Sequence, residues 1–205
     1  MITLFARASI SRWTHPVGAA LVRLGLAPNA VTVAGTVASA ASALWFFPRG
    51  ELFVGTVVVA VFLLFDVLDG AMARAGGKGS AFGGVLDASC DRIADGALFG
   101  ALVWWALVVA GDRVLGAGLL LCLVGAQVTS YVKARAEANG LSADGGAAER
   151  AERFVLVLVG TGLHGLGVPF VLGAAVWLLA ALSAITVLQR LRAAARSAQA
   201  GTSSS

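Results

Sequence analysis

The sequence is poor in charged residues. Only 13% of its 205 residues are Asp, Glu, Lys or Arg, whereas 59% are hydrophobic, and the mean hydropathy is +0.88. Soluble domains carry about a quarter charged residues, which cover the surface that faces water. This chain has too few charges for such a surface. The composition therefore excludes an ordinary soluble domain and predicts that lipid surrounds most of the protein.

Cysteine and histidine are also scarce, with 2 residues of each. Cys90 and Cys122 fall within expected helices, where a small, buried, apolar role is the simplest interpretation. So few cysteines exclude a disulfide framework. They also leave no Cys/His cluster that could bind zinc. A metal-binding hypothesis for this chain must therefore rest on oxygen ligands.

Long apolar segments make up most of the chain. A helix needs about 20 apolar residues to cross the hydrocarbon core of a bilayer, and these segments lack the alternation of a β-strand. We therefore predict an all-α, polytopic membrane protein with six transmembrane helices. They are expected at about residues 31–48, 52–75, 81–110, 114–137, 151–166 and 168–195.

The two ends of the chain differ from this bundle. Apolar residues recur near helical spacing from Ile2 to Val17, with Arg7 and Arg12 between them. That pattern is typical of an amphipathic helix on the membrane surface. We expect an interfacial helix over 1–26, a six-helix bundle over 31–195, and one membrane-embedded domain over 1–196. The small, polar residues 197–205 are predicted to form a disordered tail.

Basic residues favour one side of the predicted membrane. Of the 15 Lys and Arg, 13 lie at helix ends that would share one side, and only Arg49 and Arg113 lie on the other. Such an excess marks the cytoplasmic side. The chain is therefore expected to be a multi-pass protein of the cell membrane with both termini in the cytoplasm.

Four aspartates occur in two spaced pairs on neighbouring predicted helices. Asp66 and Asp69 are three residues apart, and Asp87 and Asp91 are four apart, so each pair shares one helix face. The short Gly-rich turn between the helices makes them antiparallel neighbours, with all four acids near the cytoplasmic end. Clustered carboxylates repel one another unless cations neutralise them. Two ions, Mg²⁺ or Mn²⁺, suit these oxygen ligands and displacement at phosphorus.

Other interpretations of the aspartates remain open. They could form structural salt bridges with Arg74 and Arg92, although two arginines cannot neutralise four carboxylates. They could also line an ion or proton pathway, as in a transporter.

Small residues and an arginine lie beside the acids. Gly70, Ala73 and Gly83 would let a flat ligand approach the backbone, and Arg74 could bind a diphosphate. Taken alone, the small residues are better explained by close helix packing. Beside four carboxylates, they are also consistent with a nucleotide cleft.

The full pattern resembles the signature of the CDP-alcohol phosphotransferase family at 8 fixed positions over 26 residues: Asp66-x2-Asp69-Gly70-x2-Ala73-Arg74-x8-Gly83-x3-Asp87-x3-Asp91. The resemblance implies that the four aspartates hold the metals and that Asp91 is also the general base. It further implies that CDP-diacylglycerol is the donor. The residues that would contact it are Asn29, Thr32, Gly70, Ala73, Arg74, Ser80 and Gly83. Members of the family commonly form homodimers, so a homodimer is expected, and nucleic acid is not expected as a partner.

Basic residues at the cytoplasmic ends of the later helices favour a phosphorylated acceptor. They are Lys133, Arg135, Arg150 and Arg153, with Arg190 and Arg192 at the end of the last helix. Residues 130–137, with Gly145 and Gly146, resemble the actinobacterial subgroup that joins CDP-diacylglycerol to inositol 1-phosphate. The resemblance implies that Lys133, Arg135, Arg153 and Arg192 bind the acceptor's phosphate. The ordinary positive-inside bias is an alternative explanation of the cluster. An enzyme that uses glycerol 3-phosphate is the alternative function.

Overall fold

The structure, a computed structural model, describes residues 27–75 and 80–202, and the side chains among them except those of 64–75 and 201–202. All regular elements of this described part are helical, which confirms the all-α prediction there. The interfacial helix predicted over 1–26 lies outside the described residues.

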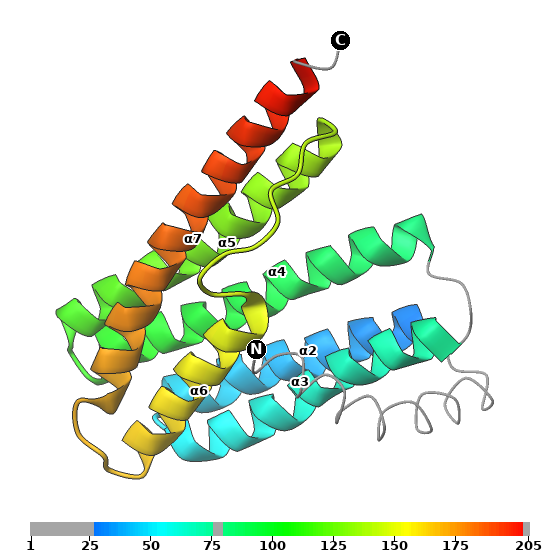
Figure 1. Cartoon of the computed structure of the whole chain (residues 1–205). Coiled ribbons are helices and arrows are strands. Elements are labelled where there is room, and N and C mark those ends of the chain that lie inside the picture. The colour runs from blue at the N-terminus through cyan, green and yellow to red at the C-terminus, as the bar shows by residue number, and fades with distance from the viewer. Residues whose placement is uncertain (1–26, 76–79, 203–205) are drawn as a thin grey trace. The chain divides into compact units, whose positions relative to one another are not determined.

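The helices follow one another with short connections (Figure 1). Their bounds are α2, Pro28–Phe46; the 3-10 turn η1, Phe47–Arg49; α3, Leu52–Ala75; α4, Ala81–Trp104; the π-helical turn η2, Trp105–Val109; α5, Arg113–Ala138; α6, Arg150–Gly165; and α7, Val171–Thr202. The predicted segments agree with these bounds to within a few residues at most ends. The breaks coincide with Gly, Pro and Asp, which interrupt apolar helices for local backbone reasons.

Four helical segments are long and apolar enough to cross a membrane. They are Pro28–Arg49, Ala81–Val109, Arg113–Ala138 and Val171–Ala200. Within the described part of α3, Leu52–Leu63 forms a shorter apolar helix, and α6 has 16 residues. The described chain thus has the character of a membrane protein, while the full set of six spans stays a prediction.

The last helix differs from its prediction at both ends. It begins at Val171 instead of residue 168, after Pro169, which lacks a backbone N–H, and Phe170, whose φ is 61°. It continues to Thr202, so the predicted disordered tail is wrong for residues 197–202. This stretch is rich in Ala, the best helix former, and the Ser197 hydroxyl accepts a hydrogen bond from the Ser142 backbone N–H at 3.1 Å.

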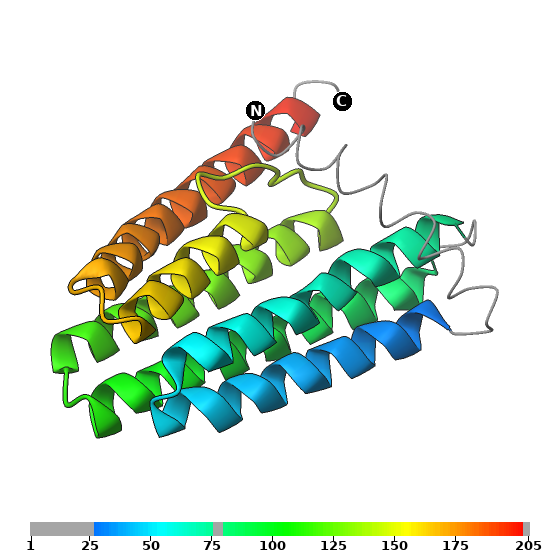
Figure 2. The same ribbon diagram turned by 90° about the horizontal axis from the view of Figure 1, so that it is seen from below.

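The chain forms two compact units. The first comprises the described parts of Met1–Ala43 and Val57–Ala97, and the second comprises those of Leu44–Thr56 and Leu98–Ser205. In the first unit, α2 and α3 run side by side in both views (Figures 1 and 2). In the second unit, α7 packs against both α5 and α6.

Glycine allows α5 and α7 to approach closely. A Cβ atom on Gly118 would lie 2.8 Å from Val176 Cγ1, and one on Gly125 would lie 2.7 Å from Ser183 Cβ. These glycines are seven residues apart and therefore share one helix face. Small residues serve the same purpose at helix contacts within membranes. This close contact fixes how α5 and α7 meet.

Candidate functional site

The acidic residues of α4 run from an exposed to a buried position. Asp87 is exposed, the Asp91 side chain keeps 20% of its surface exposed, and that of Asp95, one further turn along, keeps 1%. Asp87 and Asp91 share one face of the helix because they are four residues apart. Asp87 and Asp91 thus both keep exposed surface on this face, whereas the Asp95 side chain is almost fully buried.

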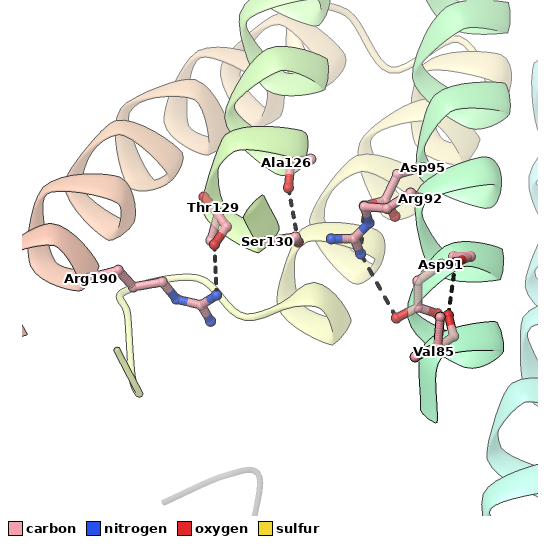
Figure 3. A network of polar contacts seen from close by, with 9 residues as sticks. Val85, Asp91, Arg92, Asp95, Ala126, Thr129, Ser130 and Arg190 are labelled. Carbon is pink, nitrogen blue, oxygen red and sulfur yellow. Dashed lines mark hydrogen bonds and ion pairs between the residues drawn. The ribbon is translucent and has the colours of Figure 1, made fainter. Parts of the chain in front are cut away.

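Arg92 lies beside two of these acids (Figure 3). Its Nη2 atom is 3.2 Å from Asp95 Oδ2 and 3.8 Å from Asp91 Oδ2. A carboxylate as buried as Asp95 needs a cationic neighbour to offset the loss of its hydration. The salt-bridge alternative therefore applies best to Asp95, which lies outside the signature.

Helix α3 carries the other pair of aspartates near its C-terminal end. Asp66 and Asp69 lie one turn apart on the helical backbone, with Gly70, Ala73 and Arg74 in the following turns. Their side chains lie outside the described set, so the convergence of four carboxylates stays a prediction. Among the side chains that the structure does describe, no group of three His, Cys, Asp or Glu residues forms a metal site.

Asp87 and Asp91 are the two signature aspartates whose side chains the structure describes, and they suit a hard divalent cation. Asp87 and Asp91 offer carboxylate oxygens from one helix face, and both retain exposed surface. Mg²⁺ and Mn²⁺ prefer oxygen ligands and keep part of their water shell, so they suit partly open positions better than a closed cage. The donor set thus supports a magnesium or manganese site.

Three residues predicted to contact CDP-diacylglycerol meet at the N-terminal ends of α2 and α4. The Ser80 hydroxyl accepts a hydrogen bond from the Gly83 N–H at 2.9 Å, which caps α4. A Cβ atom on Gly83 would lie 3.0 Å from Ser80 Oγ and 3.3 Å from Asn29 Oδ1. Glycine therefore leaves a gap between two polar side chains. Thr32 lies nearby in sequence but is buried, and its hydroxyl donates to the Pro28 carbonyl at 3.2 Å.

The gap at Gly83 gives a prediction with a built-in control. Gly83→Ala should lower kcat/KM for CDP-diacylglycerol about 10- to 100-fold, because the added methyl pushes Ser80 and Asn29 out of place by a few tenths of an ångström. The neighbouring Gly84 is exposed with open space around it, so Gly84→Ala should keep full activity. CMP release by the purified variants measures both. Equal activity of the two variants would contradict a special role for Gly83.

The basic residues predicted to bind the acceptor's phosphate lie on different helix faces of the second unit. Lys133 lies one turn beyond the buried Thr129 on the side of α5 that faces α7, whereas Arg135 is exposed on another side. Arg153 is 3% exposed in the first turn of α6. Arg192 is exposed on α7. The structure thus does not show these cations as one cluster.

Arg190, instead of Arg192, is the arginine of α7 that faces the loop between α5 and α6 (Figure 3). It is 9% exposed. Its Nη1 donates to the Thr129 carbonyl at 2.9 Å, and its Nε donates to the Gly145 carbonyl at 3.0 Å. Residues two positions apart on a helix point about 200° apart, so Arg192 is directed elsewhere.

Sequence reasoning placed Arg190 among the basic residues of the last helix but chose Arg192 for the acceptor's phosphate, although a signal that singles out Arg190 exists. Ser183, Thr186 and Arg190 are spaced by three and four residues, which places them on one face of α7. All three are buried. A polar stripe at that spacing in an otherwise apolar helix predicts a polar partner, which for Thr186 and Arg190 is the loop over residues 139–149.

Lys133 has acidic neighbours. Its Nζ atom is 3.2 Å from Asp144 Oδ1 in the loop and 3.7 Å from Glu137 Oε1 one turn along α5. The hydrogen bond from Lys133, together with one from Ser142, holds the pKa of the Asp144 carboxyl below its usual value. Sequence reasoning did not foresee this pair, because the loop and the helix meet only through folding.

Comparisons with known proteins cover nearly the whole chain. Residues 25–191 match the CDP-alcohol phosphatidyltransferase family. A phosphatidylinositol phosphate synthase of Mycobacterium marinum is 54% identical over 191 residues, which are 91% of this chain and 81% of that protein.

Solved structures show the same resemblance. Two crystal structures of Mycobacterium tuberculosis phosphatidylinositol phosphate synthase are 52% identical to this chain. The one with CDP-DAG bound has a TM-score of 0.85 and covers 89% of this chain and 94% of its own. The one in complex with manganese and citrate has a TM-score of 0.84 and covers 88% of each chain.

Proposed function

The chain belongs to the CDP-alcohol phosphatidyltransferase family, and on that basis we propose that it transfers the phosphatidyl group of CDP-diacylglycerol to inositol 1-phosphate. The products are phosphatidylinositol phosphate and CMP. One observation carries the proposal: the complete 8-position signature lies within the matched region, and its described acids, Asp87 and Asp91, share one open face of α4.

The relatives support the donor and the metal. The solved Mycobacterium tuberculosis relative holds CDP-DAG in one structure and manganese in another. We propose that Asp66, Asp69, Asp87 and Asp91 hold two divalent cations, Mg²⁺ or Mn²⁺. When bound, these ions supply positive charge that neutralises the diphosphate and the departing CMP.

The reaction needs one base and no covalent enzyme intermediate. The acceptor hydroxyl oxygen attacks the phosphorus that carries diacylglycerol, its proton passes to the Asp91 carboxylate, and the bond from that phosphorus to the CMP oxygen breaks. General base catalysis of this kind contributes about 100- to 10,000-fold in rate. The residues proposed to hold the donor's CDP group are Asn29, Thr32, Gly70, Ala73, Arg74, Ser80 and Gly83. The gap between Asn29, Ser80 and Gly83 supports this assignment.

Cations of the second unit are proposed to bind the acceptor's phosphate. They are Lys133, Arg135, Arg153 and Arg192. Hydrogen bonds from charged donors to phosphate are about twice as strong as neutral ones. A phosphorylated acceptor would thus gain from these side chains, whereas a neutral polyol would gain little.

The architecture proposed for the whole chain follows from the same considerations. We propose an interfacial helix over 1–26, six spans, one membrane-embedded domain over 1–196, an active site that faces the cytoplasm, and a homodimer in the cell membrane. The length of α3, 24 residues, supports a further span. The basic residues at the ends of the later helices support the orientation.

An acceptor assay tests the function. Detergent-purified protein is supplied with CDP-diacylglycerol and Mg²⁺, and then with inositol 1-phosphate, glycerol 3-phosphate or free inositol in separate reactions. We expect CMP release and a phosphatidylinositol phosphate product with inositol 1-phosphate alone. If only glycerol 3-phosphate reacts, the chain is a phosphatidylglycerophosphate synthase and the proposed acceptor is wrong.

A further inference from the structure

The loop over residues 139–149, between α5 and α6, is fastened to α7 at three points. The Ser142 N–H donates to Ser197 Oγ at 3.1 Å, Arg190 Nε donates to the Gly145 carbonyl at 3.0 Å, and the Ala148 N–H donates to Thr186 Oγ1 at 3.1 Å. Each bond ties the loop's backbone to a side chain of the same helix. The loop is therefore held in one position within the second unit.

This fastening places Asp144 beside Lys133. Asp144 lies between the first and second fastening points, and its Oδ1 is 3.2 Å from Lys133 Nζ. The Ser142 hydroxyl donates to its other oxygen, Oδ2, at 3.1 Å. Because the Lys133 and Ser142 hydrogen bonds lower the pKa of this carboxyl, it is an anion at neutral pH. The negative charge of Asp144 thus lies next to Lys133, the lysine that we propose binds the acceptor's phosphate.

The pair is exposed and therefore exchangeable. The Asp144 side chain keeps 73% of its surface exposed, and that of Lys133 keeps 40%. Exposed ion pairs contribute little stability, because water screens the charges and both side chains lose freedom. A phosphate group carries more negative charge than a carboxylate and has three strong acceptor oxygens. It can therefore take the place of Asp144 at Lys133 at little cost.

We propose that Asp144 is a specificity-determining residue, whose carboxylate holds the place of the acceptor's phosphate at Lys133 until a phosphorylated acceptor displaces it. The proposal rests on the proposed function, which assigns Lys133 to that phosphate. A neutral polyol cannot compete with Asp144 for the ammonium, so the loop selects for phosphate. Glu137 has no such role, because it lies on the same helix as Lys133 and its Oε1 is farther away, at 3.7 Å.

Whether removal of the Asp144 charge tightens or weakens phosphate binding shows whether Asp144 competes with phosphate or only orients Lys133. If Asp144 competes, removal of its charge frees Lys133 and binding of phosphate becomes tighter. If Asp144 only orients Lys133, removal of its charge lets the lysine move and binding becomes weaker. Asp144→Asn tests this well, because the amide oxygen can keep the Ser142 hydrogen bond and the loop's fastening points are backbone groups that stay unchanged.

Two measurements on the full-length protein in detergent test the proposal. The first is the Kd for inorganic phosphate, from the shift in thermal unfolding, which needs no turnover. We expect Asp144→Asn to lower this Kd about two- to fivefold, the range of an exposed ion pair. Glu137→Gln is the matched control and should leave the Kd within a factor of 1.5, whereas Lys133→Gln should raise it. Asp144→Ser serves as a second variant that also removes the charge.

The second measurement is steady-state turnover with inositol 1-phosphate at saturating CDP-diacylglycerol. Asp144→Asn should lower KM for the acceptor by a similar factor and leave kcat unchanged. A Kd for phosphate that is equal or higher in both Asp144 variants would overturn the inference, even if wild-type protein turns over inositol 1-phosphate. Absence of turnover in the wild type would instead refute the proposed function, and the phosphate Kd would still decide the role of Asp144.

Discussion

Replacement of Asp91 by Asn is expected to lower CMP release by at least about 1,000-fold, within the range for loss of a general base. The amide cannot accept the proton of the acceptor hydroxyl, and it is a poorer ligand for a divalent cation. Asp91 is partly exposed, with 20% of its side chain open, so the uncharged amide should not unfold the protein. Turnover of CDP-diacylglycerol, with thermal unfolding measured in parallel, checks both statements.

A matched control for Asp91→Asn is Asp112→Asn. The Asp112 side chain caps α5 by accepting a hydrogen bond from the Leu115 N–H at 2.9 Å. Asn caps helices about as well as Asp does, so this variant should keep full activity. Retained turnover in Asp91→Asn would remove that residue as the base.

Removal of divalent cations is expected to abolish CMP release completely. Without cations the acidic residues of α3 and α4 repel the diphosphate of the donor, and nothing neutralises the departing CMP. Treatment with EDTA should stop the reaction, and Mg²⁺ or Mn²⁺ should restore it. Turnover that continues in excess EDTA would contradict the metal site.

Asp87 tests the same site without chelation. Asp87→Asn should raise the concentration of Mn²⁺ needed for half-maximal activity about tenfold or more, since even second-shell changes cost 10- to 100-fold in metal affinity. Binding of Mn²⁺, followed by its electron paramagnetic resonance signal, should weaken in parallel. Glu51→Gln is a suitable control, because Glu51 is also an exposed acid but lies outside the signature. An unchanged Mn²⁺ requirement in Asp87→Asn would exclude Asp87 as a ligand.

The helices were largely predictable because they depend on local chemistry. Long apolar stretches without strand alternation are helical in a bilayer, since each segment must satisfy its own backbone hydrogen bonds there. Helix α3 has the predicted bounds of 52–75. The end of α7 was not predictable by the same rule. Its last turns are polar, and their helical state depends on Ala-rich propensity and on the contact of Ser197 with the loop.

Part of the candidate site was predictable from the sequence and part was not. The spacing of Asp87 and Asp91 places them on one face of α4 independently of the tertiary structure. That Asn29 lies beside Ser80 and Gly83 depends on the fold of the first unit, and their assignment to one ligand stays a prediction.

The sequence by itself determined that this is a membrane protein, where its helices lie, and which acids share a helix face. These properties depend on hydrophobicity and helical spacing, which act between near neighbours in the chain. Only the tertiary structure decided that Arg190 faces the loop and that Asp144 meets Lys133. Those pairings join residues from different helices and loops. They arise from the packing of α5 on α7, which brings together residues that are far apart in the chain.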